Sequence, residues 1–191
     1  MREHGVLRRG MLVYWQSAVK MRGGASQIDP AALNKAARLF RTFGEDYHER
    51  KLDEAYILPA IKKLRTRVAC YADILLAQHD RDRAITDYII YVTGKGQLRP
   101  VDVELLSRAM EGFVLMYENH AAHEDTVVFP AWKKALSQQR LHELSETFEE
   151  IEHQQLGKDG FDDAVREISE VERLLGFDDL ARFTAPVPPA R

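Results

Sequence analysis

Apolar residues recur three and four positions apart along nearly the whole chain of 191 residues, whereas alternation with period two is scarce. The first spacing places apolar side chains on one face of an α-helix, and alternation is typical of a half-buried strand. The sequence therefore predicts an all-helical fold. Its length is sufficient for one well-buried core.

Glycine and proline divide this helical pattern into segments. Paired glycines at positions 23 and 24 favour the end of a first helix, while Asp29 and Pro30 provide a cap and a first-turn proline for the next. Pro59 and Pro130 each remove a backbone donor and bend the helix that contains them. We expect helices over residues 2–21, 30–65, 68–93, 100–136, 138–156 and 162–175.

Short loops between four long helices predict an up-down-up-down four-helix bundle, to which two shorter C-terminal helices are added. The bundle is expected to occupy residues 1–137, and the C-terminal extension, packed on the bundle, residues 138–178. Residues 179–191 are proline-rich and are expected to form a loose tail.

The composition argues against several kinds of partner and site. A net charge of -3 gives no electrostatic basis for binding nucleic acid. Cys70 is the only cysteine, which excludes an internal disulfide and a cysteine-based zinc site and favours a reducing cytoplasm. No apolar run approaches the roughly 20 residues that span a bilayer, and the first residues lack the apolar core of a signal peptide. We therefore expect neither a nucleic-acid nor a membrane partner.

Two segments of the sequence resemble each other. One begins at His48 and the other at His120, and each continues through acidic residues to an apolar residue, proline and alanine. In the second segment His120 and Glu124 are four residues apart, so they project from one helical face about 40° apart. Apolar side chains share that face, namely Phe113, Met116, Tyr117, Val127 and Ala131. Both polar side chains should therefore point into the bundle, where burial without a partner is costly.

Inward histidines are predicted on all four long helices. His4 follows Glu3 in the first helix, and His79 in the third lies on the line of Ala72, Leu75, Thr86 and Ile90. A single His and Glu pair would be expected to form a hydrogen bond with each other within the core, without a metal ion. Several imidazoles and carboxylates that converge in one core are more easily explained as metal ligands.

The spaced set of these residues resembles the hemerythrin, or HHE cation-binding, family over residues 2–136. The resemblance is carried by Glu3-His4, His48 with its following acids, Gln78-His79 and His120-x-x-x-Glu124. It implies two iron ions with a bridging oxo or hydroxo group, and a protein that binds oxygen or nitric oxide for sensing, storage or stress protection. Manganese or zinc would also suit imidazole and carboxylate ligands.

The resemblance implies that His4, His48, His79 and His120 supply nitrogen, and that Glu124 and an acid of the second helix bridge the ions. This second acid remains open between Asp53 and Glu54, with Glu49 third, because Leu52 stands where the family has glutamate. Counting back from the proline aligns Asp53 with Glu124 if a π-bulge absorbs one residue, whereas periodicity favours Glu54.

Arg83 occupies the position of a second histidine in oxygen-carrying hemerythrins, which argues against reversible oxygen carriage. His153 is a candidate for an extra ligand, and His142 is expected to be exposed. We expect a small-ligand binding protein rather than an enzyme. The alternatives are a di-metal oxidase or peroxidase and a metal-free interaction module whose polar core sets helix register.

Overall fold

The computed structural model describes residues 2–23 and 28–189, and within them it contains helices and no strand, so the all-helical prediction is confirmed. The α-helices are α1 (Arg2–Arg22), α2 (Pro30–Leu39), α3 (Leu58–Lys62), α4 (Ala69–Thr93), α5 (Pro100–His123), α6 (Phe129–Lys134), α7 (Gln138–Leu156) and α8 (Gly160–Leu175). The described residues also contain two π-helical segments, η1 (Phe40–Ile57) and η2 (Glu124–Val128), and one 3-10 helix, η3 (Leu180–Phe183).

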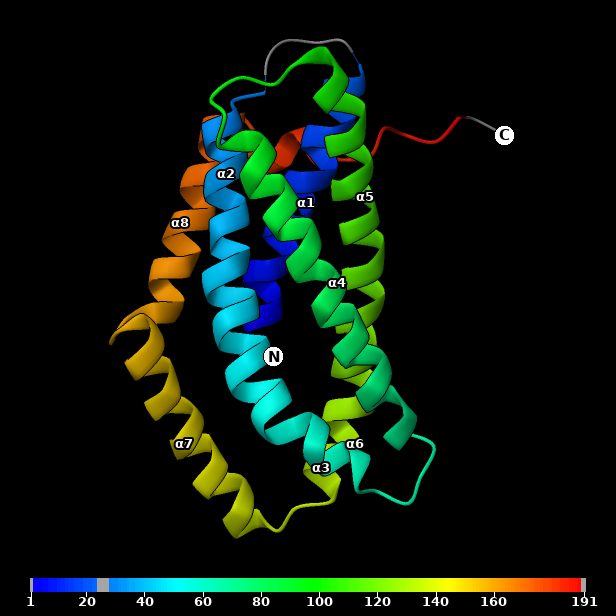
Figure 1. Cartoon of the computed structure of the whole chain (residues 1–191), viewed down its shortest axis with the longest axis vertical. Coiled ribbons are helices and arrows are strands. Elements are labelled where there is room, and N and C mark those ends of the chain that lie inside the picture. Colours follow the sequence, from blue (N-terminus) through cyan, green and yellow to red (C-terminus); the bar gives the residue numbers. More distant parts are fainter. Residues whose placement is uncertain (1, 24–27, 190–191) are drawn as a thin grey trace.

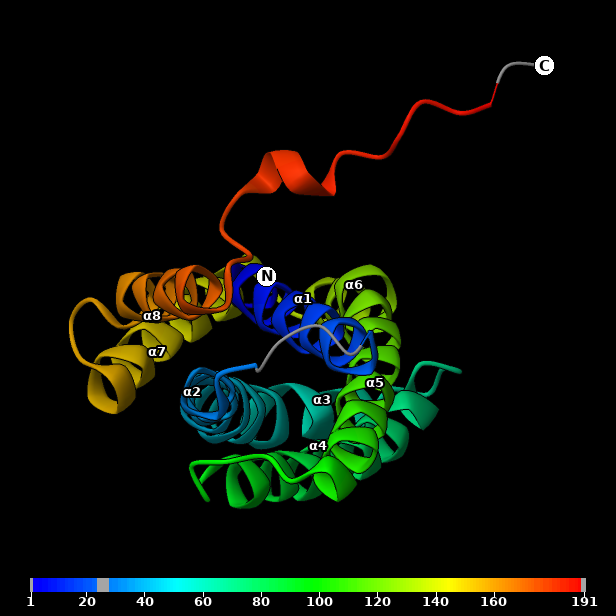
Figure 2. The ribbon, with the colours of Figure 1, turned by 90° about the horizontal axis from the view of Figure 1, so that it is seen from above.

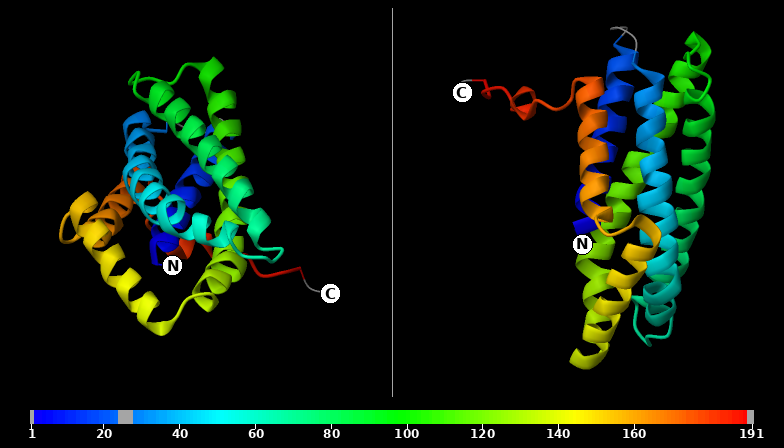
Figure 3. Two further views of the ribbon diagram at one scale, coloured as in Figure 1. Left: turned by 60° about the horizontal axis from the view of Figure 1, so that its bottom comes forward. Right: turned by 90° about the vertical axis from the view of Figure 1, so that its left-hand side faces the viewer.

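The π-helical segments join α-helices into longer helical runs. Segments α2, η1 and α3 form one run, and α5, η2 and α6 form another. These two runs lie side by side with α1 and α4 (Figure 1). The view from above places α7 and α8 along one flank, where α8 contacts α1 and α2, and α7 contacts η1 (Figure 2). The turned views show the same arrangement (Figure 3).

The helix ends fall close to the positions that the breakers predict. Asp29 Oδ1 accepts a hydrogen bond from the Ala31 amide at 2.9 Å, as expected of a cap. The first helix ends at Arg22, and Gly24 lies outside the described residues. The second run ends at Lys62 instead of residue 65, because Lys63 and Leu64 donate to carbonyls only three residues back.

Buried polar side chains separate two apolar clusters. The larger cluster includes Leu7, Phe40 and Phe113, and the smaller one includes Ile57, Leu75 and Trp132. Between them along the helices lie the side chains of four histidines and several acids, all almost fully buried: His4, His48, Glu49, Asp53, His79, Asp82, His120 and Glu124. A polar layer at this depth requires partners for its charges and lone pairs.

The two π-helical segments end in the same way. The Leu58 amide, before Pro59, donates to the Asp53 carbonyl, and the Phe129 amide, before Pro130, donates to the Glu124 carbonyl. Proline cannot donate and crowds the carbonyl four residues back, so each proline favours a wider turn directly before it. The backbone thereby places Asp53 and Glu124 at equivalent positions of the two similar segments.

The residues after α8 leave the body of the molecule. They pass through η3 and then extend away from the helices as an exposed segment (Figure 2). Residues 190–191 lie outside the described part. Among the described residues, no helix has the length and the apolar character that crossing a membrane requires.

Candidate metal centre

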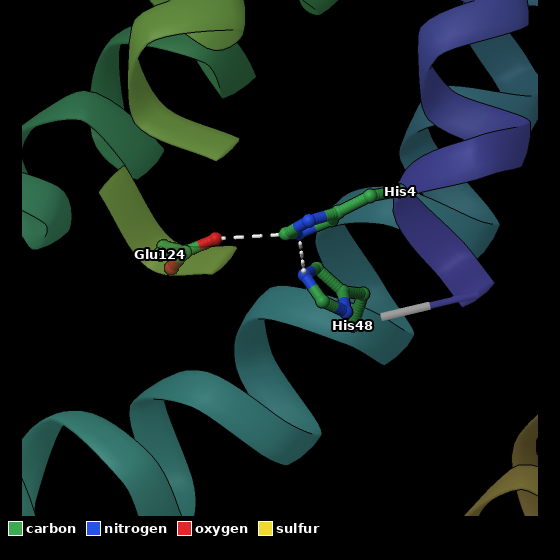
Figure 4. Close-up of side chains that lie close together, drawn as sticks. All are labelled: His4, His48 and Glu124. Atoms are coloured by element: carbon green, nitrogen blue, oxygen red, sulfur yellow. Dashed lines mark hydrogen bonds and ion pairs between the residues drawn. The ribbon is translucent and has the colours of Figure 1, made fainter. Parts of the chain in front are cut away.

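The first half of the buried cluster is formed by His4, His48 and Glu124 (Figure 4). His4 Nε2 lies 3.1 Å from His48 Nε2 and 3.3 Å from Glu124 Oε2. The three side chains come from α1, η1 and η2, so the packing of three separate helical segments creates this geometry. Each has an exposed fraction of 2% or less.

The second half is formed by His79, His120 and the same Glu124. His79 Nε2 lies 3.3 Å from His120 Nε2, and His120 Nε2 lies 3.2 Å from Glu124 Oε1. The two oxygens of Glu124 therefore face different pairs of histidines. Glu124 could therefore contribute one oxygen to each of two metal-binding groups.

The two candidate acids of the second helical run point to different places. Asp53 is fully buried, and its Oδ2 lies 3.3 Å from His48 Nε2, inside the cluster. Glu54 instead has its Oε1 3.0 Å from His79 Nδ1, the outer nitrogen of that ring, and also pairs with Arg83. Asp53 thus adjoins the converging Nε2 atoms, and Glu54 lies behind one imidazole.

The tautomers of three histidines follow from their outer contacts. The Nδ1 atoms of His4, His79 and His120 each lie 3.0 Å from an acceptor, respectively Asp125 Oδ1, Glu54 Oε1 and Gln78 Oε1. A neutral imidazole that donates from Nδ1 presents a lone pair at Nε2. Lone pairs of His79 and His120 therefore face each other at 3.3 Å. A cation between them would convert this repulsion into coordination.

Burial disfavours the charged form of two imidazoles in this layer. Burial lowers the pKa of His48 well below its ordinary value, and burial also lowers the pKa of His79. Burial and the neighbouring Glu124 raise the pKa of Asp53 well above its usual range. Burial opposes ionisation of Glu124 too, but the imidazoles of His120 and His4 offset it and lower its pKa. Two adjacent acids and four imidazoles match the donor set of transition-metal ions.

A further set of buried acids adjoins the second half. Arg83 donates to Glu49 Oε2 at 3.1 Å and to Glu54, so its guanidinium is engaged by these two acids. A guanidinium has no lone pair to offer, so Arg83 is not a ligand of the cluster. Burial and Asp82 raise the pKa of Glu49 well above its ordinary value, and burial raises the pKa of Asp82 to about 7. The helical pattern gave no signal for Asp82, although its position three residues after His79 places it on nearly the same face.

The remaining histidines lie outside the cluster. His123 is exposed and its Nδ1 lies 2.7 Å from the Asn119 carbonyl. His142 is exposed, as expected, and His153 lines a surface cavity together with Arg2 and Glu152. The sequence did not predict the contact between Asp125 and His4. The only signal for it was that Asp125 is a second acid directly after Glu124.

The most informative comparison is with longer mycobacterial proteins. Those from Mycobacterium tuberculosis strain H37Rv (uncharacterized protein Rv1995), Mycobacterium tuberculosis strain CDC 1551 (MT2051) and Mycobacterium bovis (Mb2018) are each 36% identical over 186 residues. The matched region covers 96% of this chain and 71% of each relative. The chain belongs to the family of these proteins. No family model and no solved structure matches it.

Proposed function

We propose that this protein is a hemerythrin-like four-helix bundle that holds two transition-metal ions, with iron as the foremost candidate. One ion would be held by His4, His48 and Asp53, the other by His79 and His120, and Glu124 would bridge them. One observation carries the proposal: imidazole Nε2 atoms and carboxylate oxygens converge in a fully buried layer where acceptors outnumber the available protons. Without cations this layer is strongly unfavourable.

The residues of this chain would keep such a centre neutral, dry and open to a small ligand. Acceptors behind three imidazoles fix their tautomers, which raises the basicity of the coordinating nitrogens. The aromatic rings of Phe129 and Tyr117 stack on His4 and His120, with centroids 5.8 Å and 5.2 Å apart. When bound, two ions with so few protein ligands would retain positions for oxygen or nitric oxide. We propose binding of such a ligand as the function.

Elemental analysis after anaerobic loading with Fe²⁺ tests the proposal directly. We expect close to two ions per chain, followed by a stable one-to-one spectral change on exposure to nitric oxide or oxygen. A protein that takes up no iron, manganese or zinc would overturn it and leave the metal-free interaction module.

A di-metal oxidase or peroxidase is the second candidate. It is favoured by Arg83, because this side chain pairs with Glu49 and Glu54 and supplies no ligand where an oxygen carrier has a histidine. Repeated consumption of oxygen or peroxide by the reduced, iron-loaded protein would establish an enzyme. A single stoichiometric adduct would establish a binding protein.

A further inference from the structure

Three tyrosine side chains are almost fully buried, and the hydroxyl groups of two of them lack a partner. The Tyr47 hydroxyl donates to Glu152 Oε2 at 3.4 Å, between η1 and α7. The hydroxyls of Tyr14 and Tyr117 have no hydrogen-bond partner in residues 2–23 and 28–189. A buried hydroxyl that forms no hydrogen bond destabilises a fold, so each such group requires an explanation.

The packing of the Tyr117 ring fixes the direction of its hydroxyl. Tyr117 stands one turn before His120 on α5, and its ring stacks on the His120 imidazole with centroids 5.2 Å apart and an interplanar angle of 25°. The Phe113 ring, one turn earlier, also stacks on Tyr117, with centroids 5.5 Å apart and an angle of 9°. The ring is therefore held beside a candidate ligand, and its hydroxyl cannot swing to another acceptor.

Acids of other helical segments show where this hydroxyl lies. Burial raises the pKa of Tyr117 well above its ordinary value, and four buried acids raise it further: Glu49, Asp82, Glu124 and Asp53. These acids belong to η1, α4 and η2, so the hydroxyl lies between the helices, within the layer of candidate ligands. The phenol stays protonated there and can act as a donor.

Tyr14 offers a matched comparison within the same apolar cluster. Its ring contacts Phe40 and Phe113, with centroids 5.0 Å and 5.5 Å away. Burial raises the pKa of Tyr14 well above its ordinary value too, but the acid that adds to this effect is Glu45, which is not a candidate ligand. Tyr14 and Tyr117 thus share burial and an unpartnered hydroxyl, and they differ in their distance from the candidate metal centre.

We propose that Tyr117 is a ligand-binding residue, whose hydroxyl donates a hydrogen bond to the oxygen or nitric oxide molecule held at the metal centre. This inference rests on the proposed function, and it adds a donor to a layer in which carboxylate oxygens and ring nitrogens act as acceptors. Both diatomic molecules gain electron density from a reduced transition metal. A fixed donor in a dry site stabilises such charge more than it would in water.

The test compares Tyr117→Phe with Tyr14→Phe in the full chain, loaded with Fe²⁺ and exposed to nitric oxide. Each substitution removes one buried hydroxyl that has no partner and keeps the ring, so both variants should fold and hold about two ions per chain. Loss of one hydrogen bond should make nitric oxide dissociate about tenfold faster from Tyr117→Phe. The rate should be unchanged in Tyr14→Phe.

A second measurement detects the donor hydrogen itself. The N–O stretching frequency of the bound nitric oxide should shift in D₂O in the unaltered protein and in Tyr14→Phe, because the hydroxyl hydrogen exchanges with solvent. Tyr117→Phe should lose this shift. If oxygen alone forms an adduct, its dissociation rate and its O–O stretch are measured in the same way.

A role of Tyr117 in packing alone would give a different pattern. An unchanged dissociation rate in Tyr117→Phe, an equal increase in both variants, or a D₂O shift that persists in Tyr117→Phe would overturn the inference. A lower iron content in Tyr117→Phe would also overturn it, since the residue would then support His120. An unaltered, iron-loaded protein that binds neither nitric oxide nor oxygen would instead overturn the proposed function.

Discussion

The two halves of the cluster offer similar ligands but hold them differently. In the half formed by His79 and His120, both outer ring nitrogens have acceptors 3.0 Å away. In the other half His4 has such an acceptor, whereas His48 Nδ1 has no partner among the described residues. The first half has one more carboxylate, Asp53, next to the ring nitrogens. One half is thus preorganised by hydrogen bonds, and the other relies on negative charge.

This difference predicts an order of affinity. Outer hydrogen bonds fix the orientation of metal-binding imidazoles and strengthen coordination. His79 lies in the interior of α4, while His4 stands in the first turn of α1, where a helix is least constrained. We therefore expect the ion between His79 and His120 to be held more tightly, and the ion between His4 and His48 to exchange first.

The largest effect should come from Glu124, the residue that the halves share. Glu124→Gln removes the bridging charge, so the iron content should fall from about two ions per chain to less than one. Elemental analysis after anaerobic loading measures this content. Glu118→Gln, on the exposed face of α5, is the control and should retain both ions. If Glu124→Gln retained about two iron ions per chain, metal binding in the two halves would not depend on the charge of Glu124.

Single histidine substitutions should then separate the halves. His4→Ala should leave about one tightly held ion, whereas His120→Ala should leave about one weakly held ion that a chelator removes quickly. Removal of one imidazole abolishes coordination only in its own half, and the remaining half differs between the two variants. His142→Ala is the control, because this side chain is exposed. Equal chelator resistance in the two variants would contradict the proposed order of affinity.

The acids of the second helical run give a smaller and more specific test. Asp53→Asn should weaken the ion of the first half by more than about 100-fold, since Asp53 adjoins the coordinating nitrogens. Glu54→Gln should weaken the ion of the second half by only about 10- to 100-fold, as expected of a group behind the ligand. Titration with Fe²⁺ in the presence of a competing chelator measures both. Unchanged binding in both variants would point to Glu49.

The acid that adjoins the cluster illustrates where sequence reasoning reaches its limit. Periodicity located the helices and the inward histidines because both depend on a simple repeat along one helix. It favoured Glu54 over Asp53, however, because it assumes a constant angle per residue, and η1 is π-helical through Phe40–Ile57. Counting from Pro59 selected Asp53, since the proline is the physical cause of the wider turn before it.

Contacts between side chains of different helices could not be predicted from the sequence. Asp125 and Gln78 serve as acceptors for histidines of other helices, and no periodicity along one helix specifies such pairs. The attachment of α7 through Glu152 is of the same kind, because it depends on where the extension docks. The predicted ends of the helices, by contrast, rest on local capping and proline chemistry and fall within a few residues of the observed ones.

The acid pair beside the second half predicts a pH effect on the metal-free protein. Asp82 has a pKa of about 7 in the fold against 3.8 ordinarily, because of its burial, so the folded state binds more protons between these values. The free energy of unfolding should therefore fall as the pH rises from about 4 to 7. Asp82→Asn should stabilise the metal-free protein at pH 8 by about 1–3 kcal/mol and have little effect near pH 4.

Urea unfolding at both pH values measures this difference. Asp73→Asn is a suitable control, because Asp73 is an exposed acid of the same helix. An equal gain for Asp82→Asn at pH 4 and pH 8 would mean that packing, and not ionisation, limits stability beside the second half.

The smallest expected effect concerns the first turn of α1, where the less organised half begins. The first four amides of a helix have no acceptor within it. In α1 the amides of Val6, Leu7 and Arg8 are therefore the first that donate to carbonyls of the first turn. A metal ion on His4 would hold the turn against opening, and exchange of these amides should slow by about tenfold when metal is bound. Hydrogen exchange of the metal-loaded and metal-free protein measures this.

Amides around Val171 in α8, away from the cluster, should not change. Amides of α4 near His79 should change less than those of α1, because their turn lies within a packed helix and is held without the ion. Equal protection at the start of α1 with and without metal would mean that His4 is not a ligand. The half formed by His4 and His48 would then not bind an ion in the proposed way.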